Sequence, residues 1–192
     1  MLLRYSETPT QMTSDGHFIE GYATTFDNVY YVAQDQWHER VRSQAFDKSI
    51  VSGQPVESRY NHSPDHVLGR SDLGTVQIWK DENGIRYRTK YNPADPDHQK
   101  VKAKIESGLI RGSSVAMYPH KVRWSNEGGK HILNIEEATL AECGPVNNPC
   151  NIEAVATVRS ESDKESIDLQ QSYKDWLYSQ NEFEKLDSLF AI

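Results

Sequence analysis

The stretch Gly-Leu-Ile-Arg-Gly-Ser-Ser-Val-Ala-Met, residues 108–117, places two serines at the start of an expected strand, directly after a turn bracketed by two glycines. Glycine lets the backbone adopt positive φ or approach another group closely. A serine just past such a turn is presented at the rim of a sheet. Because strand side chains alternate between two faces, the two serines are expected to point to opposite sides.

The neighbours of each serine predict which face is which. Ser113 shares its face with Val115 and Met117, so we expect it to pack against the core. Ser114 shares the other face with Ala116 alone, so we expect open space for a substrate around its hydroxyl. An ordinary turn-to-strand junction, in which both serines only shape the turn, is the alternative interpretation.

Length and charge favour a soluble, acidic, intracellular protein. The 192 residues suffice for one domain with a sizeable core, and the net charge of -7 argues against general nucleic-acid binding. No apolar run approaches the ~20 residues needed to span a bilayer. Cys143 and Cys150 cannot form a zinc site by themselves and provide no disulfide framework.

Many short strands and few helices predict an α+β, mostly β fold, either a barrel or a sandwich, and of these we expect a closed or partly open β-barrel with flanking helices. Two hairpin turns are expected, at Asn83-Gly84 and at residues 126–129. Helices are expected at residues 43–50 and 98–107, the second ending at Gly108. Strands are expected at residues 17–27, 37–41, 55–62, 74–80, 85–91, 113–117, 120–124, 131–135 and 137–146.

The composition changes near Ser160, which suggests a domain at residues 1–159 and an acidic helical tail at 160–192. From Glu161 onward, eight acidic residues and three lysines carry -5 of the net charge of -7. The apolar residues of the tail are loosely spaced like one face of a helix. Such a helix either folds back on the domain or docks on a partner, and the spacing does not decide between the two.

Serine catalysis at neutral pH needs a base within hydrogen-bond reach and a group that orients the base. Of seven histidines, His62 has the most suggestive context, because it ends an expected strand just before a tight Ser-Pro-Asp turn. His66 is its nearest competitor. We expect His98, His120 and His131 to be solvated, the first on a polar helical face and the others beside a hairpin.

Glu142 is the candidate for the orienting group. Its neighbours on a probable strand are small or apolar, and a carboxylate in such surroundings must find a partner. Strand alternation also allows Glu142 to point outward, and Asp65 is an alternative because it is close to His62 in sequence. A metal site built from His62, His66 and Asp65 is disfavoured, since the histidines flank a proline turn and no further ligand cluster is present.

Several of these segments, taken together and in order, resemble the tailed-phage prohead (capsid maturation) serine proteases over about residues 15–158. The segments that carry the resemblance are Gly21-Tyr22-Ala23, Gln44-Ala45-Phe46-Asp47-Lys48-Ser49, Tyr60-Asn61-His62, Leu68-Gly69-Arg70, Gly74-Thr75, the stretch 101–117 and Leu140-Ala141-Glu142-Cys143-Gly144-Pro145-Val146-Asn147-Asn148-Pro149. The resemblance implies the fold of the herpesvirus assembly proteases, a β-barrel with surrounding helices.

It also implies a serine endopeptidase without a cofactor or metal, acting in the host cytoplasm inside assembling procapsids. The substrates would be the scaffold, the N-terminal scaffolding region of the major capsid protein, or the protease itself, with self-association possible and no nucleic-acid or membrane partner. The match places His62, Ser114 and Glu142 on the family's catalytic positions, and the tail would serve encapsidation or autoprocessing.

The chain departs from the family pattern at four places. It has Ser63 where an acid is usual, Ser113 where an apolar residue is usual, Ala116-Met117 for Gly-Phe, and Cys143 near a usual serine. The change at Ser63 weakens any role for an acid after His62, and Ser113 is a rival nucleophile one residue from Ser114. Two alternative functions also stay open: a catalytically silent assembly or scaffold protein, and an unrelated barrel-type binding module. Normal assembly without cleaved capsid or scaffold peptides after Ser114→Ala would favour the silent scaffold.

Overall fold

The computed structural model describes residues 2–6, 10–32, 37–147 and 167–190, with side chains described for 10–32, 37–147 and 167–180. Its strands form a seven-stranded sheet and a four-stranded sheet. In the larger sheet the order is β1 (Leu2–Ser6), β10 (Gly112–Glu127), β11 (Lys130–Val146), β5 (Trp37–Val41) and β4 (Tyr30–Val32), with β6 (Glu57–Arg59) on β11 and β7 (Val67–Arg70) on β6. The smaller sheet has the order β2 (Gln11–Met12), β3 (Phe18–Thr25), β9 (Gly84–Lys90), β8 (Val76–Lys80).

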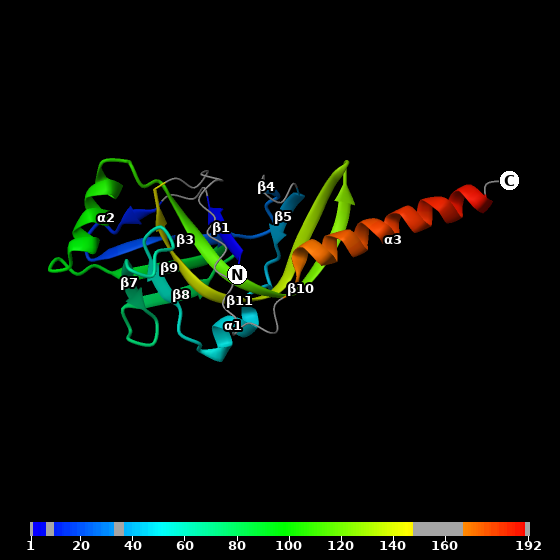
Figure 1. The fold of residues 1–192 in the computed structure, drawn as a ribbon. Helices are drawn as coiled ribbons and strands as arrows, with labels where there is room; N and C mark the ends of the chain where they lie inside the picture. The colour runs from blue at the N-terminus through cyan, green and yellow to red at the C-terminus, as the bar shows by residue number, and fades with distance from the viewer. Residues whose placement is uncertain (1, 7–9, 33–36, 148–166, 191–192) are drawn as a thin grey trace.

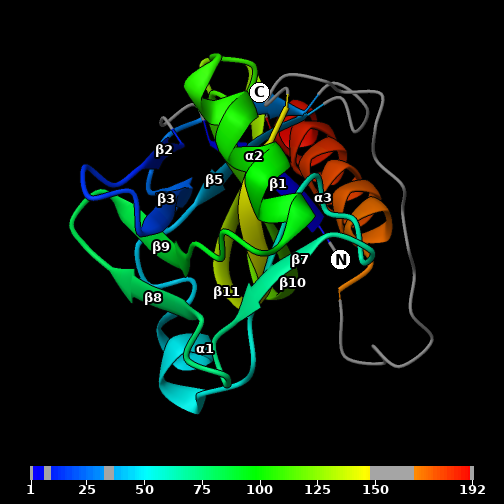
Figure 2. The ribbon, with the colours of Figure 1, turned by 90° about the vertical axis from the view of Figure 1, so that its left-hand side faces the viewer.

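The mostly-β, α+β class is confirmed, whereas a closed barrel is not what the described strands form. Strands β1 and β4 end the path of the larger sheet, and β2 and β8 end the smaller one, so no pairing between described strands completes a circle. The two sheets pack face to face instead, with β3 against β10 and β11. Figure 2 shows β2, β3, β9 and β8 beside the long strands β10 and β11.

The hairpin β10–β11 dominates the larger sheet and merges four strands that the sequence pattern separates. Register shifts at Ala116/Met117, Pro119/Lys121 and Lys121/Val122 interrupt the regular pairing. Such bulges bend a strand pair and raise its twist, which allows one hairpin to curve along the length of the molecule (Figure 1). The expected turn at residues 126–129 is present, with Gly128 and Gly129 at φ of 59° and 79°.

Two short helices flank the sheets. Helix α1 (Asp47–Ser52) begins later than expected and ends at Gly53 in the left-handed conformation. Helix α2 (Pro96–Glu106) begins two residues before the expected start, because the Asp95 side chain accepts hydrogen bonds from the backbone N–H groups of the first turn. Gly108, at φ 72°, follows the helix as predicted.

Helix α3 (Leu169–Phe190) lies at the opposite end of the molecule from α2 and extends away from the β10–β11 hairpin (Figure 1). Its first turns pack on the main core: the Trp124 indole N–H donates to Ser172 Oγ at 3.0 Å, and Tyr173 and Trp176 lie against the Trp124 ring. The described start of this helix therefore contacts the β-sheet domain. The proposed domain limit at residue 159 lies outside the described residues.

Two of the histidines expected to be solvated are not. His98 is buried, and its Nδ1 accepts a hydrogen bond from the backbone N–H of Asn92 at 3.2 Å. His131 is half-buried and lies 2.6 Å from the Tyr173 hydroxyl. The prediction that His98 lies on a solvated face of α2 was wrong, because this side of the helix packs on the loop that precedes α2.

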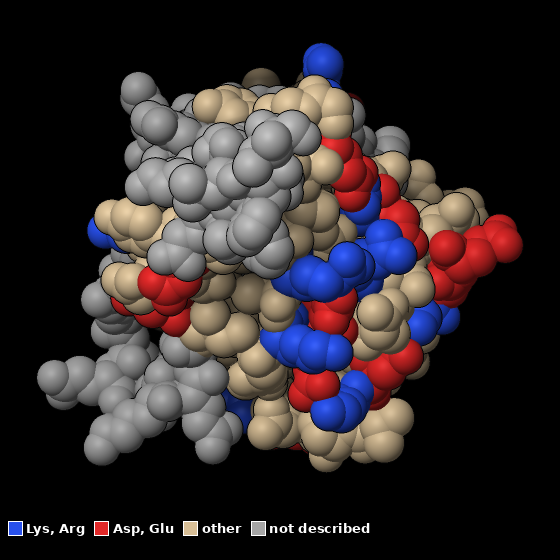
Figure 3. Space-filling view, turned by 90° about the vertical axis from the view of Figure 1, so that its right-hand side faces the viewer, with Lys and Arg blue, Asp and Glu red and all other residues tan. Residues whose placement is uncertain are grey.

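On the face shown in Figure 3, lysines and arginines lie interleaved with aspartates and glutamates rather than gathering into a patch of one sign. Ion pairs of this kind join Arg40 to Glu127 and Arg123 to Glu136. Within the described residues, no helix is long and apolar enough to cross a membrane.

Candidate active site

Three side chains from distant parts of the chain meet at one end of β10 and β11. Ser114 lies on β10, Glu142 on β11, and His62 in the turn that follows β6. The Ser114 Oγ is 2.5 Å from His62 Nε2, and His62 Nδ1 contacts Glu142 Oε1. Because an ionised carboxylate can only accept, Nδ1–H donates to Glu142, which makes Nε2 the acceptor of the serine proton.

The backbone at His62 is held in an unusual conformation. Asn61 and His62 have φ of 52° and 58°, in the left-handed region that non-glycine residues rarely adopt. Each residue in this conformation costs about 1–3 kcal/mol, so the conformation persists only where neighbouring contacts hold it. Here the Asn61 N–H donates to the Pro145 carbonyl at 3.1 Å, and Asn61 Oδ1 accepts from the Asn147 N–H at 2.9 Å. The Asn-His pair thus aims the imidazole at Ser114.

A β-bulge places Glu142 on the same face of the sheet as Ser114 and Ala116. Ala116 pairs with Glu142 and Met117 with Leu140, so Ala141 is the extra residue on β11. The Glu142 side chain is only 3 % exposed, which overturns the outward alternative. Its second oxygen, Oε2, lies 3.1 Å from Arg59 Nε. Sequence reasoning missed Arg59, although it stands three residues before His62.

Ser113 points into the core, as strand alternation predicts. Its Oγ lies 2.6 Å from Thr10 Oγ1 and 2.9 Å from the Tyr87 hydroxyl. Burial raises the pKa of Tyr87 above its ordinary value, so this hydroxyl stays neutral. Gly21 packs directly over the same serine, because a Cβ at Gly21 would lie 2.5 Å from Ser113 Oγ. These partners are neutral groups that fix Ser113 in place rather than bases that activate it.

The expectation of open space around Ser114 is wrong. Ser114 has no exposed surface, although it lies on the opposite face from Ser113. On β10 its strand neighbours are Tyr5 of β1 on one side and Gly144 of β11 on the other, and the His62 ring contacts its hydroxyl. The Ser114 hydroxyl is therefore covered in this structure, and the His62 ring is one of the groups in contact with it.

His66 and Asp65 lie outside the hydrogen-bonded contacts that join Ser114, His62 and Glu142. His66 Nδ1 pairs with Asp97 Oδ2 of α2 at 2.9 Å, and Asp65 is exposed to solvent. The carboxylate on His62 Nδ1 is that of Glu142. Among the side chains that the structure describes, no group of three or more His, Cys, Asp or Glu is arranged to hold a metal ion.

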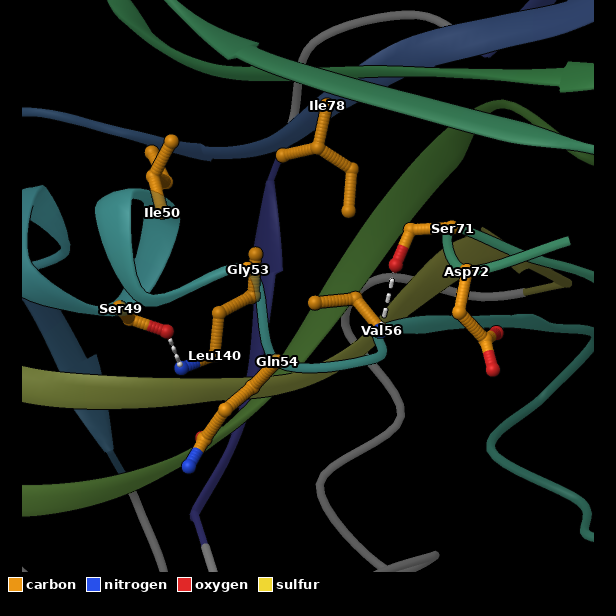
Figure 4. A pocket seen from close by; sticks show the side chains of 9 residues that line it. All are labelled: Ser49, Ile50, Gly53, Gln54, Val56, Ser71, Asp72, Ile78 and Leu140. Atoms are coloured by element: carbon orange, nitrogen blue, oxygen red, sulfur yellow. Dashed lines mark hydrogen bonds between the residues drawn. The ribbon is translucent and has the colours of Figure 1, made fainter. Parts of the chain in front are cut away.

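A cavity of about 220 Å³ is lined by residues of α1, β8, β11 and the segments beside β6 and β7, and Ser114, His62 and Glu142 are not among them (Figure 4). Its lining includes Ile50 of α1 and Leu140 of β11, two residues before Glu142. The two serine hydroxyls in its lining accept hydrogen bonds from the backbone. Ser49 Oγ accepts from the Leu140 N–H at 2.9 Å, and Ser71 Oγ accepts from the Val56 N–H at 2.8 Å. These hydrogen bonds tie the helix and the β7–β8 turn to the strands that carry the site.

Gly144 lets β6 approach β11 at the site, and its replacement gives a stability prediction. A Cβ at Gly144 would lie 2.1 Å from the carbonyl oxygen of Arg59. We expect Gly144→Ala to lower the free energy of unfolding by about 3 kcal/mol or more, because backbone must move to relieve the overlap. Urea denaturation would measure it. Gly53→Ala is the matched control: Gly53 has φ 68° but open space around it, so only about 1 kcal/mol is expected. Equal losses in the two variants would contradict the close approach.

Comparison with known families identifies one whose match covers most of the chain. Residues 5–167 match the family described as caudovirus prohead serine protease. Comparisons with curated proteins and with solved structures found no match. The herpesvirus-like fold thus stays a prediction. The family match ends just before α3 and spans every strand from β2 to β11, including the three segments that carry Ser114, His62 and Glu142. The chain belongs to the caudovirus prohead serine protease family.

Proposed function

We propose that this chain is a serine endopeptidase that cleaves proteins of the assembling procapsid, with Ser114 as nucleophile, His62 as general base and Glu142 as orienting acid. Family membership implies a serine peptidase that acts on capsid protein in procapsid maturation within the host. The observation that carries the residue assignment is the continuous hydrogen-bonded path from Ser114 through His62 to Glu142.

The path supports acyl transfer by the usual steps. His62 Nε2 takes the proton of the Ser114 hydroxyl while Oγ attacks the scissile carbonyl, and the same imidazolium then protonates the leaving amine. Water repeats the sequence on the acyl-enzyme and regenerates the serine. Glu142 keeps the proton on Nδ1 and stabilises the imidazolium that forms between the two transfers.

The substrates we propose are the scaffold, the N-terminal scaffolding region of the major capsid protein, and the protease chain itself. These segments share a location, since all would be enclosed with the protease in the procapsid. The tail beyond residue 160 is proposed to serve encapsidation or autoprocessing. Helix α3 lies outside the family match at residues 5–167, so this part of the proposal does not rest on that match.

Co-expression with the major capsid protein of the same phage tests this function. We expect the wild-type chain to yield a shortened capsid protein, read as an intact mass by mass spectrometry, and Ser114→Ala to leave it at full length. Capsids that form around full-length protein with the wild-type protease would contradict the proposal and favour a silent scaffold. Any shortened form of the protease chain in the same spectra reports self-cleavage.

A further inference from the structure

Arg59 joins the site to a row of alternating charges on β6 and β7. Its Nε lies 3.1 Å from Glu142 Oε2, while its Nε–H donates to Glu57 Oε2 at 2.7 Å and its Nη2 lies 2.6 Å from the same oxygen. Glu57 in turn lies 3.8 Å from Arg70. The Arg59 side chain is 25 % exposed, so the guanidinium lies between the buried carboxylate and the surface.

Glu142 needs a compensating charge at this position. Its Oε2 is buried and accepts no hydrogen bond from any side chain or backbone group that the structure describes. A buried carboxylate that lacks partners is strongly disfavoured in its ionised form. Arg59 supplies the positive charge within ion-pair distance of that oxygen. Without it, Glu142 and His62 together would hold a proton more tightly.

We propose that Arg59 is a positioning residue, which keeps Glu142 ionised and turned toward His62 and so sets the pH range in which His62 is a neutral base. This inference rests on the proposed function, because only a serine hydrolase needs His62 unprotonated before attack. It extends the path to four side chains, Ser114, His62, Glu142 and Arg59, drawn from β10, the turn after β6, β11 and β6.

The direction of the effect follows from the charges that face the Glu142–His62 pair. Among the side chains that the structure describes, these are Arg59 and Glu57 on β6, and Arg70 lies within ion-pair distance of Glu57. Cys143 is adjacent on β11, and burial raises the pKa of its thiol, so it contributes no charge. A positive charge disfavours a bound proton and a negative charge favours it. Removing Arg59 therefore raises the pH at which the pair loses its proton, and removing the Glu57 charge lowers it.

A histidine NMR titration tests the proposal without requiring activity. The Cε1–H resonance of His62, identified by its loss in His62→Gln, would be followed with pH in the wild type, Arg59→Met, Arg59→Lys and Glu57→Gln. We expect the midpoint to rise by roughly one pH unit in Arg59→Met, to return toward wild type in Arg59→Lys, and to fall in Glu57→Gln. Arg123→Met, which breaks an ion pair at the far end of the hairpin, is the matched control and should leave the midpoint unchanged.

If Arg59 had only a structural role, the His62 midpoint would not move in opposite directions in Arg59→Met and Glu57→Gln. An unchanged midpoint in folded Arg59→Met would overturn the proposal. If that variant does not fold, a midpoint that rises or stays constant in Glu57→Gln would overturn it instead.

The rate at which a fluorophosphonate labels Ser114 would be measured against pH on the same samples. The acid limb of this pH profile should move with the His62 midpoint. Failure of wild-type Ser114 to react at any pH would refute the proposed function, whereas the NMR shifts report on Arg59 alone.

Discussion

Replacing Ser114 with alanine is expected to lower the rate of capsid-protein cleavage about a million-fold, the loss seen when the nucleophile of a serine protease is removed. The alanine keeps the strand and its packing but has no oxygen to attack the carbonyl, and His62 then has no proton to accept. Cleavage would be followed as the appearance of the shortened capsid protein in time courses by mass spectrometry. The circular dichroism spectrum should remain that of the wild type.

Ser113→Ala is the matched control, one residue away on the same strand. Among the described side chains its hydroxyl is hydrogen-bonded to Thr10 and Tyr87 and to no histidine, so the chemistry should proceed at nearly the wild-type rate in the folded protein. The free energy of unfolding should fall by about 1–3 kcal/mol, because the buried Tyr87 hydroxyl loses a partner. Full activity in Ser114→Ala together with inactivity in folded Ser113→Ala would exchange the roles of the two serines.

Glu142→Gln should lower the cleavage rate by about 10⁴-fold while leaving the fold intact, as for the equivalent change in other serine proteases. A glutamine can offer its amide N–H to Nδ1, which stabilises the wrong tautomer, and it has no charge to stabilise the imidazolium. The same time course measures the effect. Glu127→Gln, at an exposed pair with Arg40, provides the control and should retain the wild-type rate. A loss below tenfold in Glu142→Gln would show that Glu142 does not orient His62.

The sequence located the reactive groups better than it described their surroundings. Period-two alternation correctly placed Ser113 in the core, since that rule depends only on strand geometry. It could not show that Ser114 is also buried, because strand alternation says nothing of groups from distant segments, such as the His62 ring that contacts its hydroxyl. Glu142 was ambiguous for a similar reason: unbroken alternation would put it on the face of Leu140, and the bulge at Ala141 turns it to the face of Ser114 instead.

The fold class was predicted correctly, but a closed β-barrel was not found among the described strands. Turn glycines and strand lengths carry local information, so the two hairpins and the glycine that follows α2, Gly108, were predicted correctly. A barrel closes only if the first and last strands of a sheet pair with each other. That pairing depends on the twist accumulated over the whole sheet and on the strand order, and the sequence of a single segment reveals neither. Arg59 was missed because its importance lies in a contact with a residue far along the chain, although Glu57 and Arg59 share one face of β6 beside Glu142.

The most direct test of the catalytic path is to map the site of fluorophosphonate labelling in the purified chain by peptide mass spectrometry. We expect a single adduct, on Ser114, formed in the wild type and absent from His62→Ala. That result would establish an activated serine that depends on His62. An adduct on Ser113, labelling that survives the loss of His62, or no adduct in the wild type would contradict the assignment of Ser114 and His62 as nucleophile and base.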